Sequence, residues 1–130
     1  MSASYVVTAD PDRDVLRITL SGFFDPADVR AFDQARLAAH RRLRCGANRH
    51  RTLIDVRDMK LQAQAVFEAF RLMIADPATR ARRLAFVTGD AAIRLQVRRI
   101  VQRDDVRCFA DIAAAERWLA EPPVEYALTG

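Results

Sequence analysis

Hydrophobic residues recur along this chain with two different spacings. Leu16, Ile18 and Leu20 occupy alternate positions, which is typical of a β-strand with one buried face. Val29 and Phe32 begin a series in which apolar residues recur at every third or fourth position, as on the buried side of an amphipathic helix. The two patterns follow one another along the sequence, and this alternation predicts an α/β fold.

Short runs rich in β-branched and aromatic residues predict the strands. The first two runs are separated by Asp10-Pro11-Asp12-Arg13-Asp14, whose proline and aspartates favour a turn, so we expect a β-hairpin. We interpret the third run as the central, buried strand of the sheet. The predicted strands cover residues 5–9, 15–20, 51–58, 84–87 and 106–109.

Capping signals and apolar periodicity predict a helix after each strand that follows the hairpin turn. Asp25-Pro26 combines an N-cap acid with a proline at the first helical position. Asp90 and Asp111 likewise stand just before helical patterns, and Asp76-Pro77 ends the second one. The predicted helices run from Pro26 to Leu43, from Ala63 to Ile74, from after Asp90 to Val101, and from Ile112 to Leu119.

The resulting order, β-β-α-β-α-β-α-β-α, predicts a single mixed β-sheet of about five strands flanked by about four helices. Strands separated by helices are joined by right-handed parallel crossovers, so the hairpin precedes a parallel sheet. We expect neighbours on both edges of the strand 51–58 and helices on both faces of the sheet.

Length and composition favour one domain. Of the 130 residues, 51% are hydrophobic, which is enough for a core of its own. We therefore expect a single domain over residues 1–130, with a core from about 5 to 121 and a short C-terminal tail. No apolar run is long enough to cross a bilayer, and Met1-Ser2-Ala3-Ser4 lacks the features of a signal peptide. We expect a cytoplasmic protein without a membrane span.

Positive charge is concentrated at the end of the first predicted helix and in the loop that follows it. The net charge is +4 and the pI about 9.8. Such a segment could bind the phosphates of nucleic acid or an anionic membrane surface, but it has no aromatic side chain on which bases could stack. Cations also stabilise the C-terminal end of a helix. We interpret the segment as a solvated face that binds no specific nucleic acid. This basic patch consists of Arg41, Arg42, Arg44, Arg49 and Arg51.

Candidate binding residues gather beyond the carboxyl ends of the strands, where parallel α/β sheets bind ligands. Carboxylates there could hold Mg²⁺ or act as an acid–base pair. Capping accounts for Asp25, Asp90 and Asp111 without any ligand, which leaves Asp58 as the best candidate for a functional carboxylate and no predicted metal site. The adjacent Phe23 and Phe24 either line a small apolar pocket or plug the core. The predicted ligand or partner rim contains Phe23, Phe24, Asp25, Asp58, Thr88, Gly89, Asp90 and Asp111.

Several classes of enzyme find no support in the sequence. The four glycines lie far apart, so there is no glycine-rich phosphate loop and no dinucleotide-binding fingerprint. There is no Gly-x-Ser-x-Gly elbow, and both His40 and His50 lie in or beside the basic segment. We predict no catalytic residues and no cofactor.

A family resemblance rests on three stretches: Gly22-Phe23-Phe24 before the first helix, Asp55 within Leu53-Ile54-Asp55-Val56, and Phe109-Ala110-Asp111 leading to Trp118-Leu119. In a hairpin followed by alternating strands and helices, they resemble the STAS domain. The chain is most similar to the short bacterial relatives of the sporulation anti-anti-sigma factor (SpoIIAA-like), from Tyr5 to about Glu121. The resemblance implies a non-enzymatic binding domain for a protein partner or a small apolar ligand.

The chain departs from this family at one pair of residues. Regulatory STAS proteins carry an Asp-Ser pair at the start of the helix after the central strand, and the serine accepts the phosphate. Here the corresponding residues are Ala63-Gln64, and no Ser or Thr occurs between Asp55 and Thr79. The phospho-switch is therefore not expected.

Our hypothesis is a cytoplasmic regulatory or protein-interaction module with a protein partner, and a homodimer is left open. The alternatives are a carrier of a small apolar ligand and a metal-dependent hydrolase that uses Asp58.

Overall fold

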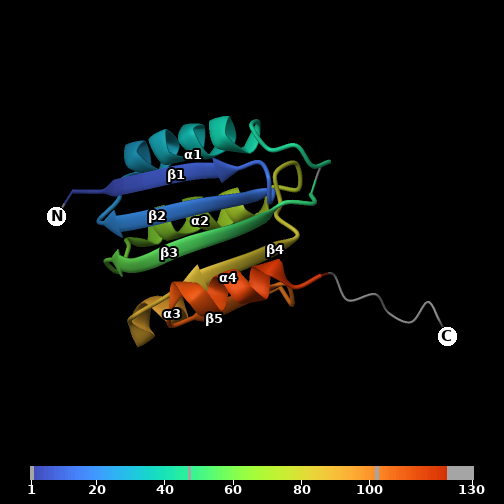
Figure 1. The fold of residues 1–130 in the computed structure, drawn as a ribbon. Helices are drawn as coiled ribbons and strands as arrows, with labels where there is room; N and C mark the ends of the chain where they lie inside the picture. The colour runs from blue at the N-terminus through green and yellow to red at the C-terminus, as the bar shows by residue number, and fades with distance from the viewer. Residues whose placement is uncertain (1, 47, 102, 123–130) are drawn as a thin grey trace.

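A computed structural model describes residues 2–46, 48–101 and 103–122 of the chain. These residues form one five-stranded sheet in the order β1-β2-β3-β4-β5 (Figure 1). β1 and β2 form the predicted antiparallel hairpin, and the other neighbouring strands are parallel, with β3 in the centre. The strands are β1 (Ser4–Asp10), β2 (Val15–Gly22), β3 (Arg51–Met59), β4 (Arg83–Val87) and β5 (Val106–Phe109). The predicted mixed sheet is confirmed.

Helices follow the strands as predicted, and three of them begin at the expected capping acids. The carboxylates of Asp25, Asp90 and Asp111 each accept a hydrogen bond from a backbone N–H in the first turn, at 2.7–2.8 Å. Such a cap satisfies a donor that has no partner within the helix. The helices are α1 (Pro26–His40), α2 (Gln64–Ala75), α3 (Ala91–Ile100) and α4 (Ile112–Ala120).

α1 ends at His40, three residues before the predicted end at Leu43. The chain tightens into a turn there, because Leu43 N–H donates to the carbonyl of His40. The backbone N–H groups of Arg44 and Cys45 then donate to the Asp14 carboxylate, which draws the chain to the hairpin turn. The predicted C-terminal tail, 123–130, lies outside the described residues.

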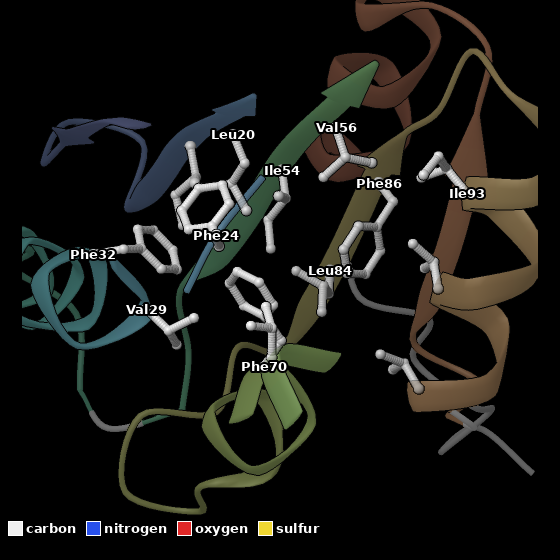
Figure 2. Close-up of a cluster of buried hydrophobic side chains, with 14 residues drawn as sticks. Leu20, Phe24, Val29, Phe32, Ile54, Val56, Phe70, Leu84, Phe86 and Ile93 are labelled. Carbon is white, nitrogen blue, oxygen red and sulfur yellow. The ribbon is translucent and has the colours of Figure 1, made fainter. Parts of the chain in front are cut away.

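The main core lies between the sheet and three helices, α1, α2 and α3. Figure 2 shows Phe24, Phe32 and Phe70 pointing into one cluster with Ile54 and Phe86 of the central strands. The Phe24 and Phe70 rings meet edge to face, with centroids 5.5 Å apart. Burial of such side chains is worth about 1.5–3 kcal/mol each, so this layer is the principal source of stability.

α4 alone covers the opposite face, and it covers only part of it (Figure 1). Its Trp118 and Leu119 pack on Leu53 of β3 and Ala85 of β4. β1 and most of β2 remain open on this side, where Val6 is 57% exposed. Helices thus lie on both faces, as predicted, but in unequal layers.

The structure also describes the helices that a bilayer would require and the two cysteines. Among the described residues, no helix is long and apolar enough to cross a membrane. Cys45 and Cys108 are both free thiols, and burial raises the pKa of each thiol above its ordinary value.

Candidate functional site at the carboxyl end of the sheet

A surface hollow opens where β2 and β3 end and α3 begins. It brings together Phe23, Asp58 and Asp90 of the predicted rim. Because parallel strands expose their carboxyl ends at one edge of the sheet, residues distant in the sequence meet there. We call this site the rim hollow; it is lined by Ser21, Phe23, Arg57, Asp58, Met59, Lys60, Leu61, Asp90 and Ile93.

The two adjacent phenylalanines separate at this site. Phe23 is 52% exposed and lines the rim hollow, whereas Phe24 is buried against Phe70. Neighbouring residues of an extended segment point to opposite sides, which explains the split. Gly22 makes the bend possible: its φ is +81°, and a Cβ there would lie 2.3 Å from the carbonyl oxygen of Ser2. Phe24 is thus a core residue and not part of the rim, which corrects its predicted place.

The predicted polar residues also divide. Asp25 forms a reciprocal capping box with Asp28 and does not line the hollow. Thr88 is buried in the sheet, and its N–H donates to the carbonyl of Phe109, so Thr88 is likewise no part of the surface. Asp90 lines the hollow while it caps α3. The Asp58 side chain makes no hydrogen bond or ion pair with another described residue, so its carboxylate is available to bind a partner.

The loop between β3 and α2 supplies residues that the sequence analysis did not single out. Leu61 is 55% exposed, and Lys60 beside it makes no side-chain ion pair within the described residues. Gln62 holds this loop in place, because its side-chain oxygen accepts from the Phe24 N–H at 2.9 Å and its amide donates to the carbonyl of Gly22 at 3.0 Å. Their position directly after the central strand was the signal that could have identified them.

A charged pair borders the rim hollow on the α4 side of the sheet. The Arg57 guanidinium donates to both carboxylate oxygens of Asp55, at 3.0 and 2.9 Å. This hydrogen bonding lowers the pKa of Asp55 below its ordinary value, so the carboxylate stays ionised. Arg57 also packs beside Gly89. The Arg57 guanidinium is thus held as a positive group beside the hollow, while the neighbouring Asp58 forms no ion pair with another described residue.

Side chains that could bind a metal ion are few around the rim hollow. Within the described part of the chain, no group of three or more His, Cys, Asp or Glu side chains is placed to hold a metal ion. The carboxylates in the lining are those of Asp58 and Asp90, and Asp90 also caps α3. The lining therefore combines these two acids with Lys60 and with the exposed apolar side chains of Phe23 and Leu61.

The basic patch lies at the opposite, amino end of the parallel strands, and part of it is committed to the fold. Arg51 donates to the carbonyl of Leu119 at the end of α4 and to that of Arg13 in the hairpin turn. Arg44 lies 3.9 Å from Asp12 in an exposed ion pair. The side chains of Arg41, Arg42 and Arg49 are exposed. The structure therefore does not bring all five guanidinium groups to one open face.

Two buried polar residues near this amino end were not singled out as site residues. Arg36 is buried, and it donates to Asp33 at 2.7 Å and to the Thr79 hydroxyl at 3.1 Å. His50 is 2% exposed and its ring lies 4.7 Å from that of His40. Burial, together with His40 and Arg36, lowers the pKa of His50 from 6.5 to about 4, so it is neutral at pH 7.

An internal cavity of about 90 Å³ lies between the sheet and the three helices of the main core. Its wall is mainly apolar and includes Phe67, Phe70 and Met73 of α2 and Val97 of α3. An engineered apolar cavity of about 150 Å³ binds benzene, and this cavity is smaller, so in its present shape it has room only for a group smaller than benzene. It is separate from the rim hollow except at Met59 and Ile93, which line both.

Comparison with known proteins addresses the family and the fold. The family model described as SpoIIAA-like matches residues 15–120. The crystal structure of an uncharacterized protein with a SpoIIAA-like fold from Shewanella loihica PV-4 has a TM-score of 0.68 at 13% identity, covering 90% of this chain and 93% of that chain. An anti-sigma factor antagonist from Mycobacterium paratuberculosis has a TM-score of 0.64 at 13% identity, covering 92% and 96%. These two likenesses concern the fold. No curated protein matches the chain.

Proposed function

Since the chain belongs to the SpoIIAA-like family, we propose that it is a cytoplasmic, non-enzymatic regulatory module that binds a protein partner through the rim hollow. One protein of similar fold is an anti-sigma factor antagonist, which supports a regulatory role of this kind. The module has no phospho-switch and needs no cofactor.

The composition of the rim hollow carries this proposal. Phe23 and Leu61 are each more than half exposed, and they stand beside Asp58 and Lys60, whose side chains pair with nothing else in the described residues. Protein interfaces combine an apolar centre with a polar rim in this way, and their aromatic residues contribute most of the affinity. Charges left unpaired at the edge then select the partner.

The start of α2 supports the absence of a phospho-switch. The helix begins at Gln64 and its N-cap is Ala63, which has no side-chain oxygen to cap the helix or accept a phosphate. The preceding Gln62 is engaged in holding the loop. After incubation with a serine kinase of the anti-sigma type, peptide mass spectrometry is expected to find no phosphate between Lys60 and Arg71.

Affinity purification of the tagged full chain from its own host tests the proposal. We expect a protein to co-purify with the wild type and to be lost from the double variant Phe23→Ser/Leu61→Ser. The matched control is Leu72→Ser, because Leu72 is 59% exposed but lies on α2, outside the rim hollow. Retention of the partner by the double variant, or its loss from the control, would exclude the rim hollow as the binding surface.

A second candidate function is a carrier of a small apolar ligand, and the internal cavity favours it. Native mass spectrometry of the same purified material distinguishes the two: a protein mass supports the module, whereas a small bound mass supports the carrier. Phe70→Trp is expected to fill the cavity and displace such a ligand, while partner binding at the rim hollow is retained. A hydrolase would instead show metal-dependent turnover that Asp58→Ala abolishes.

A further inference from the structure

The outer edge of β1 has no strand beside it in the described structure. β1 is the first strand in the sheet order and pairs only with β2. The backbone N–H and C=O groups that point away from β2 therefore form a row with no partner strand, which is a template for pairing with another strand.

Three of the features with which proteins protect such an edge, namely charged side chains, proline and β-bulges, are missing from residues 4–9 of β1. Residues 4–9 include no charged residue and no proline, and the register with β2 is unbroken from Ser4 to Asp10. The opposite edge differs: β5 has only four residues, and one of them is Arg107. Short edge strands and charged side chains discourage pairing between molecules, so β5 is protected where β1 is open.

The side chains of β1 and the neighbouring flank of α1 are compatible with close approach. Tyr5 packs edge to face on Phe32 of α1, with ring centroids 5.8 Å apart, and Val6 points to the other, open face of the sheet. Figure 1 shows α1 running alongside β1 at this edge of the molecule. By helical geometry, the flank of α1 that faces away from Arg36 and α2 carries the small residues Ala31 and Ala38, both exposed.

We propose that the edge of β1 binds the β1 of a second copy of this chain in an antiparallel arrangement, which joins two sheets into one. An antiparallel pair related by a two-fold axis is self-complementary, because each residue meets its partner in both directions. With the axis at Val6, Ser4 lies opposite Thr8 and Tyr5 opposite Val7, so no like charges face each other. This uncharged stretch fits a copy of itself better than a charged foreign strand.

Dimerisation of this kind leaves the rim hollow open. The two copies of β1 run in opposite directions, so the carboxyl ends of the two parallel sheets point to opposite ends of the joined sheet. The dimer therefore presents two separate rim hollows, neither of them covered by the other copy. The proposal stands on β1 alone and does not depend on what the rim hollow binds.

Light scattering and sedimentation equilibrium of the full chain over a range of concentrations test the proposal. The wild type is expected to approach twice the 14.7 kDa of one chain. Val6→Lys places two cations opposite each other at the axis and is expected to weaken the dimer about tenfold or more. Leu72→Lys is the matched control, because Leu72 is as exposed as Val6 but lies on α2. The control is expected to dimerise like the wild type.

Two further measurements distinguish pairing at β1 from association through another surface. Mixing the Val6→Lys and Val6→Glu variants is expected to restore a dimer of one copy of each, because opposite charges then meet at the axis. In the wild type, hydrogen exchange of β1 amides should slow as concentration rises, while that of β5 amides should not change. A wild type that stays at 14.7 kDa, or a Val6→Lys variant that dimerises like the control, would overturn the proposal.

Discussion

At the amino end of the parallel strands, three arginines donate to carboxylate, hydroxyl or backbone carbonyl oxygens, whereas at the carboxyl end Asp58 and Lys60 face solvent. Arg36 bonds to Asp33 and Thr79, and Arg51 bonds to the carbonyls of Leu119 and Arg13. Arg83 likewise donates to the carbonyl of Trp118. These arginines join segments that are distant in the sequence, so their charge serves the fold.

Side chains at the carboxyl end of the strands make fewer contacts with the rest of the fold. Asp58 and Lys60 pair with nothing else in the described residues, and Phe23 and Leu61 expose more than half of their surface. A stable fold does not require these groups, because their removal leaves no buried partner unsatisfied. The number of charged residues is therefore a poor guide to function, and the number of bonds that each one makes is a better guide.

The largest effect expected at the amino end is a loss of stability in mild acid. The pKa of His50 falls from 6.5 to about 4 on folding, so below pH 6.5 the unfolded chain takes up a proton that the folded chain does not. Stability is unaffected above pH 6.5, and about 3 kcal/mol is lost by pH 4. Urea unfolding at pH 7, 5.5 and 4.5 measures this loss.

His50→Gln is the control for this pH dependence, because it removes the titrating group and keeps a polar side chain. His40, Arg36 and Asp14 face the same site and are unchanged in the variant. Carboxylates such as Asp55 have lowered pKa values, so their contribution is lost only at lower pH. If the variant loses as much stability as the wild type between pH 6.5 and 4.5, His50 is not the cause.

A smaller effect is expected when Arg36 is replaced. Arg36→Ala should lower the free energy of unfolding by about 2 kcal/mol, because it removes a buried stem and the hydrogen bonds to Asp33 and Thr79. Arg36→Met keeps most of the stem and should recover part of the loss. Lys60→Ala at the carboxyl end should change stability by less than about 0.5 kcal/mol. Equal losses in the free energy of unfolding for Arg36→Ala and Lys60→Ala would show that charged residues at the two ends stabilise the fold equally.

Two aspartates near the carboxyl end are expected to differ in how much they stabilise the fold. Asp25→Ala is expected to cost about 1 kcal/mol, because the carboxylate accepts from the Asp28 N–H at 2.8 Å and completes the capping box. Asp58→Ala, which breaks no described bond, should leave the free energy of unfolding unchanged within about 0.5 kcal/mol. Thermal and urea unfolding at pH 7 compare the two. A destabilised Asp58→Ala would show that Asp58 serves the fold.

The weakest effect is expected from the exposed arginines of the basic patch. Duplex DNA should bind with a Kd of roughly 10⁻⁴ M or weaker near physiological salt, because Arg51 is engaged by carbonyls and Arg44 lies near Asp12. Fluorescence anisotropy with random duplex and single-stranded probes at two salt concentrations measures this. The opposite result would be sub-micromolar binding that the double variant Arg41→Glu/Arg42→Glu abolishes. It would show that the amino end of the sheet binds nucleic acid.

Local patterns in the sequence were enough to predict the type and order of the secondary-structure elements. The alternation of Leu16, Ile18 and Leu20 predicted β2, and the capping acids Asp25 and Asp111 predicted where helices begin. These signals are local: a strand and a helix bury different spacings of residues, and a cap bonds within its own turn. The resemblance to the SpoIIAA-like family, which the family match confirms, followed from the same order of elements.

Contacts between distant segments of the folded chain set which of these residues are exposed and free to bind. It buried Phe24 and exposed Phe23, and it placed Arg51 against the carbonyl of Leu119, a residue 68 positions away. It also gathered Leu61 with Asp90 in one hollow. Such contacts join segments that no local pattern relates, because the path of the chain in space brings them together. Whether a charge holds the fold or meets a partner depends on those contacts, so the candidate site emerged only from the folded chain.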